Sequence, residues 1–419
     1  MNTLYCGCFV DTPVIGTFSV KECVLISEQG QILYSGTKSQ LPSKFLVGRT
    51  INFSDRLIIP GFADLHLHSS QLPICGLGLE KGQDWFRDYC YPAESEYRDL
   101  EYSHSLNKEL IKRLIRNGIT RSNIMCTTDV RSALDLFDQF LKSGLSARIG
   151  KMNSDHDAFE AAQEDTEESQ RETMEYLAET RDRDSLVQPS VCPEFLPAVS
   201  DKMMEFIGKT AARLQIPVHT HMAEGEDDVM LVKNRYGRNE TYGSVYERYG
   251  LLGDGNSVTA VMAHCLLNEP DDIRRLARHH SMVVHCPYAG LDSGSHHLLN
   301  VRDYLNNGVS VALGSDIGGG HTLNMMRTMI AAMNISRQVE KSHPLTFPEV
   351  FYLATKGGGS LFGRTLSFET GYQFDALVIN DSSRMKFPGQ SVENRVASLI
   401  YTADTSEISA VYCNGKKIA

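Results

Sequence analysis

The sequence lacks several features that mark other classes of protein. No stretch of its 419 residues approaches the roughly 20 apolar residues that a membrane-spanning helix needs. The first residues have neither a basic start nor a long apolar core, so we expect no signal peptide. A net charge of −11 argues against nucleic acid or an anionic membrane as the main partner. These absences favour a small-molecule ligand.

Paired cysteines and nucleotide-binding motifs are missing too. The ten cysteines include no CxxC pair, and several, such as Cys126 and Cys265, lie in apolar runs where a reduced cysteine acts as a small core residue. Disulfide frameworks belong to short secreted chains, so we expect a cytoplasmic protein. Neither a GxGxxG motif nor a P-loop follows a candidate strand. This absence disfavours a doubly wound nucleotide-binding sheet.

The middle of the chain alternates between apolar, β-branched runs and helix-like stretches. The eight runs are IIPGFADLHLH, GITRSNIM, ARIGKMNSD, LVQPSVCP, PVHTHMAE, VTAVMAHC, SMVVHCP and GVSVALGSD. Between them, apolar residues recur at threes and fours, as in 129–143 and 201–214. Eight such alternations predict an α/β fold, a (β/α)8 TIM-type barrel.

The two ends of the chain have a different pattern. Short apolar runs broken by turn signals precede Pro60, and strand-like runs occur at 374–380 and 407–418. Asn414-Gly415 is typical of a hairpin turn. We therefore expect a small β-sandwich domain from residues 1–59 and 368–419, with the barrel domain at 60–367.

Metal-ligand residues gather where the predicted barrel strands end, which is where TIM barrels collect their catalytic groups. His66 and His68 end the first run, and a period of two places both imidazoles on one face. Later runs end in or beside His221, Glu224, His264 and Asp316. Three imidazoles and one carboxylate make a mononuclear metal site with a position left for water. Zinc and iron both suit such ligands.

The order of these motifs resembles that of the amidohydrolase superfamily over nearly the whole chain. The stretches that carry the resemblance are PGFADLHLH, HMAE, MAHC and LGSD. Within the superfamily, HLHSSQ, Asp84-Trp85 before YCYPAE, SVYERYGLLG and LGSDIGGGHT are similar to the guanine deaminase group. The resemblance implies hydrolytic deamination of an amino-substituted N-heterocycle, with guanine, giving xanthine and ammonia, as the first candidate. It also implies a homodimer.

The resemblance further implies a role for each motif residue. One divalent metal ion, zinc or alternatively iron, would be bound by His66, His68, His221 and Asp316. A single ion is expected because the fourth run ends without a lysine suited to carbamylation. Asp316 would take a proton from the attacking water, Glu224 would deliver a proton to the ring and the departing amine, and His264 would stabilise the tetrahedral adduct. The implied substrate contacts are Gln71, Trp85, Glu194 and Phe195.

Three further histidines have other expected places. His219 shares a face with His221 but lies one layer deeper, so we expect it behind the ligands or in the core. His285 ends the seventh run and is expected to be structural. His321 follows the Asp316 loop and could reach the barrel mouth.

One substrate contact departs from the guanine deaminase pattern. That group typically has Pro-Arg-Phe after the fourth strand, with the arginine donating to the purine carbonyl, whereas this chain has Pro193-Glu194-Phe195. A carboxylate accepts hydrogen bonds where a guanidinium donates them. Either Glu194 faces a ligand rich in N–H donors, or it points away and pairs with a basic residue.

Alternatives to guanine deamination therefore stay open. The ring could be a pterin, another aminopurine, a triazine or a cytosine-like ring. Ring chloride or a cyclic amide could also be the group attacked, although Glu224 and His264 favour amine loss because the amine needs a proton to depart. A metal-free scaffold is the alternative outside enzymes, and the complete set of expected ligands argues against it.

Overall fold

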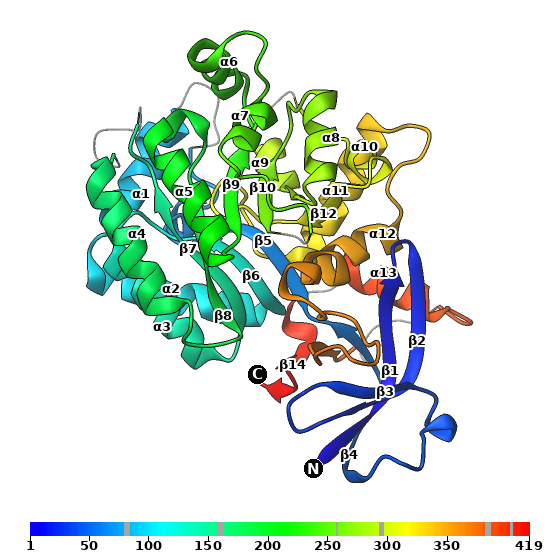
Figure 1. Cartoon of the computed structure of the whole chain (residues 1–419). Helices are drawn as coiled ribbons and strands as arrows, with labels where there is room; N and C mark the ends of the chain where they lie inside the picture. Colours follow the sequence, from blue (N-terminus) through cyan, green and yellow to red (C-terminus); the bar gives the residue numbers. More distant parts are fainter. Residues whose placement is uncertain (79–83, 157–162, 257–258, 293–296, 382–386, 403–404) are drawn as a thin grey trace.

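The computed structural model describes residues 1–78, 84–156, 163–256, 259–292, 297–381, 387–402 and 405–419. An eight-stranded parallel sheet forms a barrel, and both chain ends lie together beside it (Figure 1). The barrel strands are β5 (Phe62–His68), β6 (Ile119–Met125), β7 (Ser146–Asn153), β8 (Val187–Pro193), β9 (Val218–Met222), β10 (Ala260–His264), β11 (Met282–His285) and β12 (Ser310–Leu313). Each predicted run forms one of these strands, so the predicted barrel is confirmed.

The last strand meets the first through the segment that follows it. The backbone N–H of Asp316 donates to the His66 carbonyl at 2.8 Å, and the N–H of His68 donates to the Ile317 carbonyl at 2.9 Å. These two hydrogen bonds join the end of β5 to the chain just after β12. They also bring Asp316 next to the two histidines of β5.

Helices cover the outside of the barrel. They are α1 (Tyr91–Glu96), α2 (Leu100–Arg116), α3 (Val130–Ser143), α4 (Thr166–Thr180), α5 (Asp201–Leu214), α6 (Glu226–Tyr236), α7 (Tyr242–Arg248), α8 (Pro270–Arg278), α9 (Pro287–Asp292), α10 (Val301–Asn306), α11 (Met325–Val339) and α12 (Phe347–Tyr352). The α3 helix shows why they form where they do. Asp129 caps its first turn by accepting from the Ser132 N–H, and Gly144 ends it in the left-handed conformation at φ 79°. Its apolar face, with Phe137 and Phe140, is fully buried.

The two chain ends form one seven-stranded mixed sheet. Its order is β15-β14-β13-β4-β1-β2-β3. The bounds are β1 (Asn2–Val14), β2 (Thr17–Ile26), β3 (Ile32–Gly36), β4 (Val47–Pro60), β13 (Ala376–Ile379), β14 (Ile408–Cys413) and β15 (Lys416–Lys417). Aromatic rings from both ends share its core, as where Tyr5 stacks on Phe374 with centroids 5.0 Å apart. A small β domain from both ends is thus confirmed, while its residue boundaries stay a proposal.

Contacts between the barrel and this sheet are polar as well as apolar. Asp375, just before β13, accepts two hydrogen bonds from the guanidinium of Arg121 on β6, at 2.7 and 3.1 Å. Both side chains are almost fully buried.

Helix α13 (Val392–Thr402), which lies between β13 and β14, packs against α11 and adds Leu399 to the barrel core. Among the described residues, no helix has the length and apolarity to span a bilayer.

Candidate metal centre and active site

The histidine pair of β5 points into the barrel at its carboxyl end. Residues 64, 66 and 68 alternate with Leu65 and Leu67, so a single face of the strand carries the polar side chains. His66 is fully buried and His68 is 5% exposed. Burial, and after it the neighbouring imidazoles, lower the pKa of both rings well below the usual value. Both are therefore neutral imidazoles, the form that binds metals.

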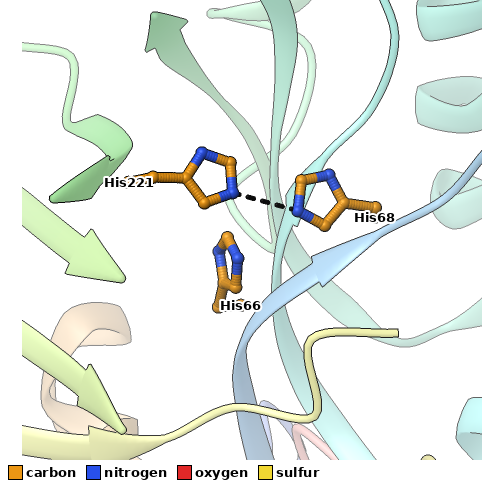
Figure 2. A group of neighbouring side chains, drawn as sticks. All are labelled: His66, His68 and His221. Carbon is orange, nitrogen blue, oxygen red and sulfur yellow. Dashed lines mark hydrogen bonds between the residues drawn. The ribbon is translucent and has the colours of Figure 1, made fainter. Parts of the chain in front are cut away.

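The third imidazole comes from β9, and its orientation is set by the backbone. His221 Nδ1 lies 2.7 Å from the Glu194 carbonyl, to which it donates, so its Nε2 carries a lone pair. That Nε2 lies 3.2 Å from Nε2 of His68 (Figure 2). The three rings point toward one another, as Figure 2 shows, with ligand atoms of His66, His68 and His221 all within 4.8 Å of one another.

The carboxylate of Asp316 completes this cluster. Its Oδ1 lies 3.1 Å from His66 Nε2 and 3.5 Å from His68 Nε2. Asp316 has a left-handed backbone at φ 49°, a conformation that costs non-glycine residues of order 1–3 kcal/mol and gathers at functional sites. Beneath it, the buried Asp64 accepts from the Ser315 N–H at 2.9 Å and anchors this turn.

These residues fit a divalent cation. Three imidazole nitrogens and a carboxylate oxygen converge, and His66 Nε2, which faces the cluster, is buried with no hydrogen-bond partner among the described residues. Two neutral rings that face each other through Nε2 repel where both carry lone pairs, and a cation between them removes that repulsion. Nitrogen and oxygen donors of this kind suit zinc and iron.

Glu224 and His264 lie beside the cluster. His264 Nδ1 is 3.5 Å from a Glu224 carboxylate oxygen, and its Nε2 is 3.9 Å from Asp316 Oδ2. His264 is 2% exposed, whereas the Glu224 side chain is 40% accessible because it faces the barrel mouth. Removal from bulk water, followed by the charge of Asp316, raises the pKa of the Glu224 carboxyl. This pair thus offers a proton carrier and a hydrogen-bond donor next to the three-histidine cluster.

His219 lies directly behind one proposed ligand. Its Nε2 is 2.9 Å from His66 Nδ1, and it is fully buried. A partner on the far ring nitrogen orients a ligating histidine and leaves its other nitrogen for the metal. His66 therefore presents Nε2 to Asp316 and to the cluster.

Two of the expected substrate contacts follow β5. Gln71 is 6% exposed, and its side-chain N–H donates to Cys90 Sγ at 3.3 Å. Trp85 precedes a π-helical turn, η3 (Phe86–Cys90), and packs in a small apolar cluster with Ile74 and Ala93. Its indole N–H is buried and has no partner among the described residues. Both residues thus lie on the segment that connects β5 to α1.

The other two expected contacts follow β8. Glu194 uses its backbone carbonyl for His221, and its carboxylate accepts from the Ser154 hydroxyl at 2.7 Å. The described residues include no basic partner for that carboxylate. Phe195 is partly exposed, with an extended backbone at φ −163°. Glu194 therefore contacts the three-histidine cluster through its backbone, and its carboxylate makes no ion pair with a described residue.

Two further histidines, His285 and His321, are not part of the three-histidine cluster. His285 is 2% exposed, neither ring nitrogen has a described partner, and burial lowers its pKa to about 3. It is a neutral buried ring. His321 pairs with Asp292 at 2.5 Å and packs edge-on against Tyr288.

Two buried carboxyls near the site, Asp64 and Glu94, were not predicted from the sequence. Asp64 is on the same strand face as His66 and His68, so the two-residue period was a signal that could have found it. Glu94, in YCYPAE, is 7% exposed and accepts from the Ser70 hydroxyl. This contact could not be predicted from the sequence, because a loop separates Glu94 on α1 from Ser70 at the end of β5.

Comparison with known proteins agrees with this geometry. The amidohydrolase family pattern matches residues 57–418. The chain belongs to the amidohydrolase family. A guanine deaminase of Dictyostelium discoideum is 31% identical over 88% of this chain and 84% of its own length. One of Escherichia coli is 28% identical over 95% and 91%.

A solved structure shares the complete fold of this amidohydrolase. The guanine deaminase of C. acetobutylicum, determined with guanine in its active site, superposes with a TM-score of 0.94 and 34% identity, covering 100% of both chains. Within the amidohydrolase family, this chain therefore falls in the guanine deaminase-like group.

Proposed function

We propose that this amidohydrolase is a metal-dependent aminohydrolase that converts guanine and water into xanthine and ammonia. The observation that supports it most is the convergence of His66, His68, His221 and Asp316 beside Glu224 and His264, in a chain whose relatives are guanine deaminases. The proposed ligands are the three histidines and Asp316, and the proposed ion is zinc, with iron as the alternative.

A divalent cation held by these ligands would lower the pKa of water at the site to about 7, which makes a nucleophile available at neutral pH. The protein then has to place the ring and move protons. Asp316 Oδ2, which points toward His264, is placed to accept the proton that water loses. The new bond joins the water oxygen to the ring carbon that carries the amine.

Glu224 would supply the protons that amine loss requires. Its carboxyl faces the mouth and lies 3.5 Å from His264 Nδ1, so it can protonate the ring nitrogen next to the attacked carbon and then the departing amine. The C–N bond breaks, ammonia leaves, and the ring keeps the carbonyl oxygen. His264 would donate a hydrogen bond to the oxygen that develops negative charge.

Ammonia release from a small panel of rings tests this proposal. The panel is guanine, adenine, cytosine, isoxanthopterin and ammelide, offered to zinc-loaded protein. We expect guanine to be hydrolysed fastest among them, and hydrolysis to stop when a chelator removes the metal. Ammonia from another ring alone would identify a relative of different specificity, and no ammonia from any ring would contradict the proposal.

A second, smaller proposal concerns the oligomeric state and the location of the protein. The resemblance supports a homodimer in the cytoplasm. Light scattering of the purified chain tests the dimer, for which we expect about twice the monomer mass of 46.7 kDa.

A further inference from the structure

A thiol lies among the buried histidines of the site. Cys286 follows β11 directly and is 5% exposed. Ligand atoms of His66, His264 and Cys286 all lie within 4.8 Å of one another, the same limit that encloses the three-histidine cluster. Donor atoms around one tetrahedral ion, at bond lengths of about 2.0–2.3 Å, are roughly 3.5 Å apart, so small side-chain movements bring this group to binding distance.

Two further observations support this arrangement. The rings of His66 and His264 have centroids 5.2 Å apart, and their planes are inclined at 82°. Gly314, just after β12, lies beside the other pair: a Cβ atom there would be 3.0 Å from His66 Cβ and 3.1 Å from Cys286 Sγ. The lack of a side chain at Gly314 therefore lets the thiol and the imidazole approach each other across the end of β12.

The contacts around this group show which atoms it offers. Nδ1 of His66 is 2.9 Å from His219 Nε2, so the His66 ring offers Nε2, which faces Asp316 at 3.1 Å. The Cys286 thiol donates to the Val284 carbonyl at 3.8 Å. Because S–H is a weak donor, little hydrogen bonding is lost when a cation replaces the thiol proton, which passes to solvent.

One thiolate and two imidazoles favour a softer cation than three imidazoles and a carboxylate do. Thiolates select soft and borderline ions such as copper(I) and zinc, whereas carboxylates also suit magnesium and manganese. Nε2 of His66 belongs to both groups of ligands and has one lone pair, so it binds one cation at a time. Occupation of one group therefore takes a ligand from the other.

We propose that His66, His264 and Cys286 form an inhibitory site for thiophilic divalent cations. A cation bound there withdraws His66 from the three-histidine cluster and His264 from the charge that develops on the substrate. A sulfur–metal bond forms as the thiol loses its proton to solvent. The inhibition rests on the proposed aminohydrolase activity, whereas the binding does not.

Cadmium is the probe, added to zinc-loaded protein in the absence of substrate. We expect a thiolate-to-cadmium charge-transfer band in the ultraviolet that grows as one zinc ion per chain is released to an indicator dye. Magnesium should produce neither signal. Zinc release without the band would show simple exchange at the three-histidine cluster, and the band without zinc release would show a thiol that binds without His66. Either result would overturn the proposal.

Variants of the ligands sharpen this test, each compared at unchanged Tm. Cys286→Ser and Cys286→Ala should lose the band, and a band that survives in both would refute the site. His264→Ala should weaken cadmium binding, read from the band, by about tenfold or more, since loss of even a partner behind a ligand costs about 10–100-fold in affinity. Unchanged affinity would leave a lone thiol and would also refute the site. Cys192→Ser is the matched control: Cys192 is fully buried with Met125 and Met152, in no such ligand group among the described residues, and its loss leaves the band unchanged. The wild-type band and zinc release decide the matter alone where a variant does not fold.

Guanine hydrolysis separates this inference from the proposed function. Cadmium should inhibit ammonia release by the wild type, and Cys286→Ser should need about tenfold more cadmium for half-inhibition of its own rate. Equal sensitivity of the two proteins would refute inhibition through Cys286. No ammonia from guanine before cadmium is added would refute the proposed function, while the band and the zinc release still decide the cation site.

Discussion

Replacing Glu224 by glutamine is the sharpest single perturbation of the proposed chemistry. Glutamine has nearly the same shape and still reaches His264, 3.5 Å from the carboxylate in the wild type, but it cannot deliver a proton. Loss of a general acid–base group costs about 10²–10⁴ in rate, or about 3–5 kcal/mol of activation free energy. The side chain is 40% accessible, so water can replace part of the lost proton transfer, and we expect a fall in kcat of about 10²–10³.

The assay is steady-state ammonia release from guanine, with metal content and thermal unfolding measured on the same preparations. Glu224 is not among the proposed ligands, so the variant should retain its metal and its Tm. Glu226→Gln, two residues further on at the start of α6, should retain full activity because that side chain pairs with His297 on the surface. A Glu224→Gln enzyme within tenfold of wild-type kcat, with metal unchanged, would refute the assigned role.

Three further predictions concern metal affinity, stability and pH. His219→Ala removes the group 2.9 Å behind His66 and should weaken metal binding about 10–100-fold in a chelator competition, whereas unchanged affinity would make His219 a core residue only. Asp375→Ala leaves the buried Arg121 guanidinium without its partner and should lower the free energy of unfolding by about 3–5 kcal/mol in urea titrations; a loss below about 1 kcal/mol would contradict this. Burial raises the pKa of Glu94 to about 7, above its value of about 4.3 in an unfolded chain, so its contribution to stability is complete below pH 4 and is lost as the pH rises to 7. The Glu94→Gln variant should therefore show a smaller fall in Tm between pH 5 and 7 than the wild type, and equal slopes would argue against the shift.

The barrel was predictable because its signals are local. Each strand is a short apolar run. At the end of a strand, the two-residue period of side chains places alternate residues on one face, as it does for His66 and His68. Parallel strands in a barrel bring these ends to one rim, so neighbours in space could be inferred from position along each run. The small sheet was predictable in the same way from its hairpin turn at Asn414-Gly415, where both residues have positive φ.

The parts that depend on distant packing could not be predicted. The partner of Glu194 is Ser154, 40 residues earlier, and no periodicity relates the two. Glu94 comes from a helix that follows a loop, so only the fold brings it to the Ser70 hydroxyl. Helix α13 lies between two strands of the small sheet in the chain, yet it packs on α11 of the barrel.

The most direct test of the central claim is product analysis of guanine hydrolysis in ¹⁸O-labelled water by the zinc-loaded protein. We expect xanthine and ammonia in equal amounts, with one ¹⁸O atom at C2 of xanthine and no product after the metal is removed. Guanine recovered unchanged from metal-loaded, folded protein, or a product that retains the 2-amino group, would contradict it.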